Sequence, residues 1–266
     1  MKEQLSDLFE SWYNNPVKFS VDCFGEEPDA LQKELFEAVA SHNRIAVRSG
    51  NGPGKSWSVA KLGLWFFFTR PYSDVITTAP TYDQVQRVIW KEIRANMAKS
   101  ELLKSFVDLL PRDPTMFMIQ EDGSKNDDWA MFGRSSTQKE NMQGYHARHL
   151  MFIIDEASGV DDEIFEAIEG SQTEAGANKA KIVMIGNPTR TEGYFFEAFH
   201  SKSHLWKTIH FDCRLSPRVS KDWIEQKKEE YGEESPFFKV RVLGDFPLGG
   251  DDALIPLYWI EKAIRG

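Results

Sequence analysis

The stretch that decides the fold is Arg48-Ser49-Gly50-Asn51-Gly52-Pro53-Gly54-Lys55-Ser56. An apolar run at 45–47 precedes it and predicts a short strand, and residues 57–62 after it are typical of the first turns of a helix. A strand, a Gly-rich turn, Lys-Ser and a helix form the pattern of a phosphate-binding loop. Glycines let the backbone curl until successive N–H groups face one anion, and the positive end of the helix adds to that field. We therefore expect Lys55 to reach the β- and γ-phosphates of a nucleotide and Ser56 to ligate Mg²⁺.

The loop departs from the common pattern G-x-x-x-x-G-K-[ST] at its first position, where Ser49 replaces glycine. Gly50 and Gly52 supply flexibility slightly later in the loop. The alternative interpretation is a Gly-rich turn before a helix in which Lys-Ser occurs by chance. The other motifs of the chain must separate the two.

The composition is that of an ordinary globular protein, with 41% hydrophobic and 27% charged residues among 266. No apolar stretch reaches membrane-spanning length, and the run Leu62–Phe68 predicts a buried helix segment. Cys23 and Cys213 lack metal or redox spacing and are expected to be free thiols. The net charge of −9 excludes a broad basic face, so any contact with DNA must be local or supplied by another part of the protein.

A second motif follows the continuous apolar run at 150–154, which is typical of a strand buried on both faces of a parallel sheet. The run ends in Asp155 and Glu156, and ligands bind at the carboxyl ends of such strands. We expect Asp155 to hold Mg²⁺ through water and Glu156 to polarise the water that attacks the γ-phosphate. The alternative is a strand that ends in a solvated acidic turn.

Predicted strands alternate with predicted helices along most of the chain, which indicates an α/β fold with a mostly parallel central sheet flanked by helices. Residues 100–128 show no regular pattern, and residues 213–250 are predicted to form a small lid subdomain. The further predicted strands are 74–78, 129–132, 181–185 and 206–211. The predicted helices include 27–39, with Pro28 in its first turn, and 161–170. Another predicted helix follows a capping box at Thr81 and has Val85, Val88, Ile89 and Ile93 on one face.

Gln32 lies beside the apolar face of the helix at 27–39, shortly before the phosphate loop. In several ATPase families a glutamine at this place contacts the adenine edge. A solvated helix glutamine is the alternative that the spacing leaves open.

Six motifs in sequence order then suggest a family. They are Val47–Ser56, Thr78-Ala79-Pro80-Thr81, Gln143-Gly144-Tyr145-His146-Ala147, Ile153-Ile154-Asp155-Glu156-Ala157, Ile185-Gly186-Asn187-Pro188-Thr189 and Arg241-Val242-Leu243-Gly244-Asp245-Phe246-Pro247. With these motifs, from about Gln32 to Glu261, the chain resembles the ATPase domain of a phage large terminase subunit, the motor that packages double-stranded DNA into a procapsid.

The resemblance implies a P-loop NTPase fold of the ASCE type, the strand-inserted class with a glutamate beside the Walker B aspartate. It implies a core at 1–212 with an N-terminal helical extension, a lid at 213–250 and a linker at 251–266 toward a nuclease domain. ATP and Mg²⁺ are the implied cofactors. The implied partners are double-stranded DNA, the portal protein, the small terminase subunit and further copies of the chain in a ring, with no membrane, in the cytoplasm of the infected bacterial host.

The resemblance also implies roles for individual residues. Gly50 to Ser56 would cradle the phosphates, Lys55 and Glu156 would be catalytic, and Asn187 would belong to a motif that senses the γ-phosphate. For Asn187, an Asn-Pro turn is the alternative. The predicted ATP-binding residues are Gln32, Arg48, Ser49, Gly50, Asn51, Gly52, Pro53, Gly54, Lys55 and Ser56, and the predicted Mg²⁺ ligands are Ser56 and Asp155.

The chain departs from the family at two positions where an arginine is common. Asn51 occupies the place of an arginine inside the loop, and Gln143 occupies a second such place. A catalytic arginine acting from a neighbouring subunit is therefore our hypothesis. Arg148 is favoured because it precedes the Asp-Glu strand, and Arg48, Arg134 and Arg190 are the other candidates.

We expect the chain to hydrolyse ATP and not to cut DNA, because the acidic ligands of the family's nuclease domain have no counterpart in the sequence. One alternative is a superfamily 2-like helicase or translocase, which the Thr-Ala-Pro-Thr motif fits. Another is a nucleotide-binding regulatory switch that hydrolyses ATP slowly.

Overall fold

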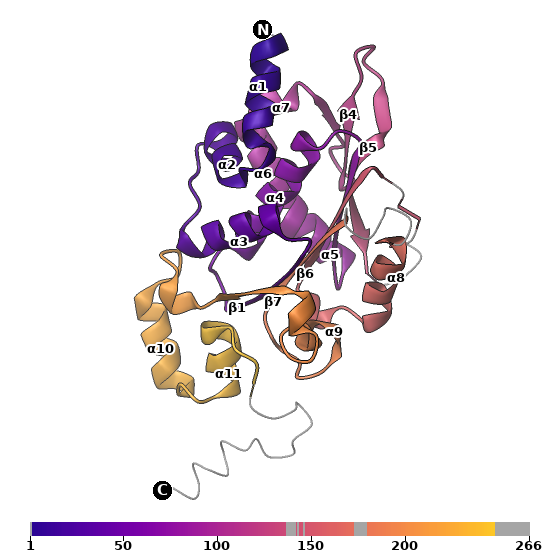
Figure 1. Ribbon diagram of the computed structural model, residues 1–266. Helices are drawn as coiled ribbons and strands as arrows, with labels where there is room; N and C mark the ends of the chain where they lie inside the picture. Colours follow the sequence, from indigo (N-terminus) through magenta and orange to yellow (C-terminus); the bar gives the residue numbers. More distant parts are fainter. Residues whose placement is uncertain (1, 137–141, 143, 146, 173–179, 248–266) are drawn as a thin grey trace, which may run out of the picture.

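The computed structural model describes residues 2–136, 142, 144–145, 147–172 and 180–247, and its centre is one eight-stranded sheet (Figure 1). The strands lie in the order β3-β4-β5-β2-β6-β7-β1-β8. Their bounds are β1 Arg44–Ser49, β2 Ser73–Ala79, β3 Val107–Leu109, β4 Thr115–Ile119, β5 Lys125–Ser135, β6 His149–Asp155, β7 Ala180–Gly186 and β8 Lys207–Phe211. Every strand predicted from the sequence is present.

The helices and helical turns fill the intervals between the strands. They are α1 Lys2–Tyr13, α2 Pro16–Phe24, α3 Ala30–Ser41, α4 Lys55–Thr69, α5 Tyr82–Gln84, η1 Val85–Ile89, α6 Trp90–Lys99, α7 Glu101–Lys104, η3 Ala157–Gly159, α8 Asp162–Gln172, α9 Gly193–Glu197, η4 Ser203–Leu205, η5 Cys213–Leu215, α10 Lys221–Tyr231, α11 Pro236–Phe238 and η6 Lys239–Leu243.

The sheet is mostly parallel, as predicted, with an antiparallel edge. Strands β8, β1, β7, β6, β2 and β5 pair in parallel, and β3 and β4 add to β5 in antiparallel register. The edge arises from residues 100–128, where no regular pattern was found. Its strands are three and five residues long and enclose Pro111 and Pro114, so neither shows a clear alternation.

Helices cover both faces of the sheet, and alternate side chains of each strand enter two separate cores. Helices α1 to α4 and α6 lie on one face, and α8 and α9 lie on the other (Figure 1). Val47 and Ile153 belong to the first core, and Ala46 and Ile154 belong to the second. This two-sided burial is why the central strands are continuously apolar. The run Leu62–Phe68 is buried in α4, as predicted.

The strand order brings the predicted motifs to one edge of the sheet. Strand β7 lies between β1, which leads into the phosphate loop, and β6, which ends in the acid pair. This inserted strand is the arrangement predicted for the ASCE class. Because β1, β7 and β6 are parallel, their carboxyl ends meet at the same edge.

One helix start differs from the sequence prediction. Helix α3 begins at Ala30, so Pro28 lies before its first turn. Asp29 caps the helix instead, in a reciprocal capping box with Gln32. The polar N-cap therefore defined the start better than the proline did.

The helix after β2 begins with the predicted capping box at Thr81, but it continues as the π-turn η1. The wider turn shifts the apolar face, which comprises Val85, Ile89 and Ile93, while Val88 is 38% exposed. The prediction that Val88 shares the buried face was therefore wrong.

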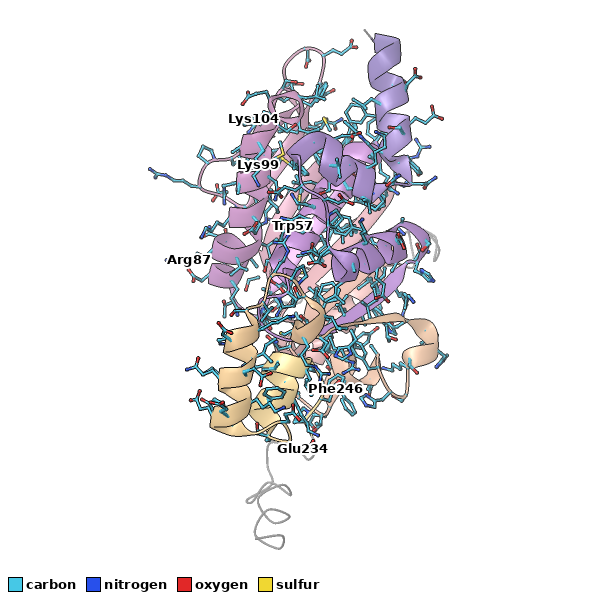
Figure 2. All side chains as sticks on the ribbon, turned by 90° about the vertical axis from the view of Figure 1, so that its left-hand side faces the viewer. Trp57, Arg87, Lys99, Lys104, Glu234 and Phe246 are labelled. Atoms are coloured by element: carbon cyan, nitrogen blue, oxygen red, sulfur yellow. The ribbon has the colours of Figure 1, made fainter. Side chains whose placement is uncertain are left out.

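The C-terminal part of the described chain, residues 213–247, packs beside the carboxyl edge of the sheet with a small core of its own. Cys213, Ile224, Phe238 and Val242 form that core. In Figure 2, Glu234 marks the lower end of this segment, well below Trp57 of α4. The predicted linker at 251–266 lies outside the described residues, and the division at 213 and 250 stays a prediction. No helix in the described ranges is long and apolar enough to cross a membrane.

Candidate functional site

The loop between β1 and α4 turns on two glycines with positive φ. Gly52 has φ 89° and Gly54 has φ 92°, in the region that favours glycine. The N–H and the hydroxyl of Ser58 both donate to the carbonyl of Gly54, at 3.0 and 2.9 Å, so α4 begins directly after the turn. The N–H groups of this first turn have no partner inside the helix and form a site for an anion.

Fewer loop amides face the predicted phosphate site than the sequence suggested. The N–H of Gly50 donates to the carbonyl of Phe211 at 3.0 Å, and the N–H of Asn51 donates to the carbonyl of Arg241 at 2.7 Å. Pro53 has no N–H. The amides to which the described residues offer no acceptor are those of Gly52, Gly54, Lys55 and Ser56. The anion nest is therefore narrower than Gly50 to Ser56.

The Lys55 side chain, only 10% exposed, contacts neutral oxygens more closely than any acid among the described residues. Its Nζ donates to the carbonyl of Gly50 at 3.0 Å and to Oδ1 of Asn187 at 3.4 Å, and Oε1 of Glu156 is 3.9 Å away. A nearly buried ammonium without a close carboxylate has unsatisfied charge. Lys55 is therefore available to an anionic ligand at the loop.

Strand β6 ends in two acids with different surroundings. Asp155 is 3% exposed. Its burial, and after that the charge of Glu156, raise its pKa to about 6, although Lys55 and the Glu156 N–H, 3.0 Å from Oδ1, act in the opposite direction. The Glu156 side chain is 37% exposed. One acid is thus enclosed and the other is open to water, so the alternative of a wholly solvated acidic turn does not hold for Asp155.

The backbone at Glu156 requires glycine on the neighbouring strand. Glu156 has φ 48°, a left-handed conformation that side chains rarely adopt. A Cβ on Gly186 of β7 would lie 2.8 Å from the backbone nitrogen of Ala157 and 3.1 Å from Cα of Glu156. Gly186, the last residue of β7, therefore leaves room for the turn that holds Glu156.

Asn187, at the tip of β7, links the loop to its surroundings through its side chain. It is 2% exposed, and its Nδ2 donates to the carbonyl of Ser49 at 2.6 Å. Its Oδ1 accepts hydrogen bonds from Lys55 and, at 3.3 Å, from Nη1 of Arg241. Its carbonyl also accepts from Thr189 at 2.9 Å, so the predicted turn is present as well. The amide does more than start a turn.

Gln32 lies against the loop and is completely buried, so the alternative of a solvated glutamine was wrong. Its Nε2 faces the carbonyl of Pro53 at 3.5 Å, and its Oε1 accepts from the N–H of Asp29 at 3.0 Å. A Cβ on Gly54 would lie 2.3 Å from this Nε2 and 3.2 Å from Cδ of Arg218. The contact with adenine stays a prediction, now with Arg218 as a neighbour that the sequence did not suggest.

Arg48 and Ser49 brace the base of the loop. Arg48 forms an ion pair with Asp245, and its Nη1 donates to the carbonyl of Gly244 at 3.1 Å. The buried Ser49 hydroxyl donates to the carbonyl of Gly50 at 2.9 Å. Both side chains therefore have internal partners, whereas Ser56, in the first turn of α4, is half-buried.

The candidate arginines lie at different edges of the sheet. Arg148 is exposed and precedes β6, at the end opposite Asp155, and a seven-residue strand spans roughly 20 Å. Arg134 pairs in register with Thr78, so it lies at the same edge as the acids but two strands away from β6. Arg190 is exposed beyond β7. Arg148 is thus remote from the loop of its own chain, and a role for it would require a neighbouring copy.

Arg241 is the residue that sequence reasoning missed. In the sequence it is the first residue of the motif at 241–247, and no role is predicted for it there. The structure brings its guanidinium to Asn187 and its carbonyl to Asn51, so it belongs to the same cluster as Lys55. The one signal in the sequence was its place in that motif.

The donor set fits Mg²⁺. Ser56 and Asp155 offer oxygen ligands, which Mg²⁺ prefers. Within the described ranges, no group of three or more His, Cys, Asp or Glu side chains could hold a metal alone. This pattern is typical of Mg²⁺ sites, where phosphates and water complete the coordination.

Comparisons with known proteins place the chain near one family. No protein-family model matches the chain. It is 31% identical over 258 residues to "Probable terminase, large subunit" of Enterobacteria phage P7, in an alignment that covers 91% of this chain and 50% of that protein. The chain thus spans about half the length of the curated relative it matches.

Solved structures share the fold. The large terminase ATPase domain of Thermus phage P74-26 has a TM-score of 0.67 at 18% identity, covering 85% of this chain and 96% of that one. The large terminase of bacteriophage HK97 has a TM-score of 0.67 at 14% identity, covering 88% and 55%. The large terminase of a thermophilic bacteriophage, solved in complex with ATP-gamma-S, has a TM-score of 0.61 at 17% identity, covering 82% and 53%.

The sheet order and the loop define a P-loop NTPase fold. The curated relative is a probable large terminase subunit, and the solved structures that share the fold include a large terminase ATPase domain and other large terminases. The resemblance predicted from the six motifs is therefore confirmed.

Proposed function

We propose that this chain is the ATPase motor domain of a large terminase and hydrolyses ATP to move double-stranded DNA into a viral procapsid. The observation that carries the proposal is the convergence of Lys55, Glu156 and Asn187 at the carboxyl edge of the sheet, next to an anion nest. The similarity to the phage P7 terminase supports the choice of this motor over a helicase or a switch.

The phosphates bind at the four free loop amides and Lys55, with the γ-phosphate toward Glu156. A water molecule then attacks the γ-phosphorus, and Glu156, which is open to water, accepts a proton from it. The bond between the γ-phosphorus and the bridging oxygen breaks, and ADP leaves with that oxygen. Lys55 stabilises the negative charge on the transferred group, and inorganic phosphate is the second product.

Ser56 and Asp155 would hold Mg²⁺ in this proposal, Asp155 through water. When bound, the ion would supply positive charge next to the phosphates. The enclosed position of Asp155 supports this role, because a buried carboxylate needs a positive partner. Gln32 contacts the adenine edge from its place against Pro53.

The partners follow from the packaging role. They are double-stranded DNA, the portal protein, the small terminase subunit and further copies of this chain in a ring, in the cytoplasm of the infected host. The net charge of −9 restricts DNA contacts to a local surface. Residues 213–250 serve as a lid, since their backbone already accepts the Asn51 N–H of the loop.

The test is phosphate release by the purified chain with Mg²⁺-ATP, with and without blunt double-stranded DNA. We expect hydrolysis that DNA accelerates and no strand displacement. Glu156→Gln should reduce the rate at least about 100-fold, because it removes the proton acceptor. Glu166→Gln, an exposed acid on α8, is the matched control and should leave the rate unchanged.

Two outcomes would overturn the proposal. One is an unchanged rate of ATP hydrolysis in Glu156→Gln, which would show that Glu156 is not the proton acceptor. The other is DNA strand displacement by the unmodified chain, which would favour the helicase.

A further inference from the structure

The loop lacks the arginine that the family resemblance leads one to expect, and the fold brings another arginine close to that position. Asn51 occupies the expected place. The backbone N–H of Asn51 donates to the carbonyl of Arg241 at 2.7 Å, from a turn 190 residues further along the chain. The π-turn η6 therefore carries Arg241 to the loop.

The guanidinium of Arg241 and the ammonium of Lys55 share one acceptor. Nη1 of Arg241 lies 3.3 Å from Oδ1 of Asn187, and Nζ of Lys55 lies 3.4 Å from the same oxygen. Two cations that share one neutral acceptor repel each other. The arrangement becomes favourable when an anion lies between or beside them.

Arg241 also lacks a carboxylate partner among the described residues, although it is half-buried. Two other half-buried arginines differ in this respect. Arg44 pairs with Glu169 at 2.8 Å, and Arg48 pairs with Asp245. A guanidinium held next to the phosphate-binding lysine without an acid is suited to bind phosphate, and its planar fork leaves further N–H groups free.

The position of Arg241 is fixed by close backbone packing. A Cβ on Gly50 would lie 2.9 Å from the carbonyl oxygen of Arg241 and 2.7 Å from that of Val242. A Cβ on Gly244, which has φ 69°, would lie 2.6 Å from the nitrogen of Gly50. Glycines at both positions let η6 lie directly on the loop, and π-turns of this kind are frequent at functional sites.

We propose that Arg241 is the cis-acting arginine of this site and binds the γ-phosphate of the ATP held by its own chain. It takes the place of the arginine that is absent at position 51. The proposal rests on the proposed ATP hydrolysis and names a ligand of its γ-phosphate. When hydrolysis removes that phosphate, Arg241 loses its anion, so the same contact reports the nucleotide state to the lid segment.

Nucleotide binding gives the first test, in a Glu156→Gln background that slows hydrolysis. Arg241→Ala should weaken the binding of ATP-gamma-S about 10- to 100-fold and leave the binding of ADP nearly unchanged, since ADP lacks the γ-phosphate. Arg241→Lys should restore part of the affinity. Equal weakening of both nucleotides would indicate a merely structural role and would overturn the proposal.

Hydrolysis gives the second test and separates cis from trans action. Arg241→Ala should lower kcat about 100- to 1000-fold, while Arg214→Ala, a lid arginine with its own acid, should not. Mixtures of Arg241→Ala and Glu156→Gln chains in the assembled ring should remain inactive, because each chain lacks one group of its own site. Recovery of activity in the mixture would show action in trans and would overturn the assignment.

The two proposals fail in different ways. If the unmodified chain hydrolyses no ATP, the proposed function fails. The selective effect of Arg241→Ala on ATP-gamma-S over ADP would still decide the role of Arg241.

Discussion

Two lysines of helix α4 carry buried charge in opposite ways. Among the described residues, Lys55 at the start of the helix donates hydrogen bonds only to oxygens of Gly50 and Asn187, and its nearest acid is 3.9 Å away. Lys61, six residues later, is completely buried and forms an ion pair with Glu26 at 2.8 Å. One charge is left for a ligand, and the other is satisfied by the protein.

Further contacts of Lys61 stabilise its buried charge. Its ammonium also donates to Asn96 and lies over the rings of Phe24 and Trp57, at 4.2 and 4.6 Å. Burial outweighs the ion pair for Lys61 and lowers its pKa to about 8. Burial would raise the pKa of Glu26, but hydrogen bonds from Lys61 and Lys99 outweigh it and lower the pKa to about 2. Figure 2 labels Lys99 and Trp57 on the side of the molecule that faces the viewer.

The comparison teaches that burial of a lysine does not identify its role, whereas the quality of its pairing does. A buried ion pair contributes to the fold when its partners satisfy it, and an unpaired buried cation needs a ligand. The same substitution at the two positions should therefore have opposite consequences.

Lys55→Met gives the largest expected effect on activity. Hydrolysis should fall about 100- to 1000-fold, because a cation on the transferred phosphate is lost. The free energy of unfolding without nucleotide should change by less than about 1 kcal/mol, since Lys55 loses hydrogen bonds to two neutral oxygens and no close ion pair. Phosphate release and urea denaturation measure the two quantities. A large loss of stability would mean that Lys55 supports the fold, and the contrast with Lys61 would disappear.

Lys61→Met should do the reverse. The free energy of unfolding should fall by about 2 kcal/mol, less than for a fully isolated charge, because Glu26 keeps Lys99 and Trp57. Hydrolysis per folded molecule should stay close to that of the parent. Lys99→Met, at the exposed end of the network, is the control and should cost less than about 1 kcal/mol. A selective loss of hydrolysis in Lys61→Met would place Lys61 in the site.

The free energy of unfolding at acidic pH gives a second measurement of the Lys61 network. The lowered pKa of Glu26 stabilises the fold above its unfolded value of 4.5, and this contribution is lost as the pH falls toward 2. In Lys61→Met the free energy of unfolding should fall less on acidification, since a main cause of the lowered pKa of Glu26 is gone. Lys55→Met should leave the slope unchanged.

The local parts of the site could be predicted from the sequence because their chemistry is local. The loop at 48–56 and the pair Asp155 and Glu156 each lie within one short stretch, bounded by a buried strand. Parallel strand pairing then brings such stretches to one edge. Roles assigned within a motif, such as that of Asn187, remain predictions, although the structure places its side chain beside Lys55.

The parts that escaped prediction depend on distant contacts. Arg241 meets Asn187 across 54 residues, and Arg48 meets Asp245 across 197. Hydrophobic periodicity reports which face of an element is buried, and it carries no information on which distant polar groups meet there. The role of Arg148 stays a prediction, because it precedes β6 at the end opposite Asp155 and could act only on the site of a neighbouring copy.

Asp155, which is buried, and Asp74, which is half-buried, extend the comparison to acids. Burial raises the pKa of both Asp155 and Asp74 to about 6. Asp155 has Lys55 nearby, whereas Asp74, near the start of β2, has the like charge of Asp128 and no ion-pair partner among the described residues. The Oδ1 atom of Asp74 is also buried without a hydrogen-bond partner in the described structure, although a backbone hydrogen bond from Ala130 acts to lower the pKa of the carboxyl. Asp74 should therefore be a weakness of the fold and not a site.

Asp74→Asn should accordingly stabilise the protein, with the smallest effect of the series. A carboxyl whose pKa is raised in the folded state contributes stability below its unfolded value of 3.8 and loses it as the pH rises through about 6. The variant should be more stable by about 1 kcal/mol at pH 7, and the difference should vanish near pH 4. Urea denaturation at both pH values measures it, and Asp127→Asn, an exposed neighbour, should show no such pH dependence. Destabilisation by Asp74→Asn at pH 7 would mean that the protein satisfies the Asp74 charge. The pairing of a charged side chain would then not be enough to distinguish ligand-binding residues from structural ones in this molecule.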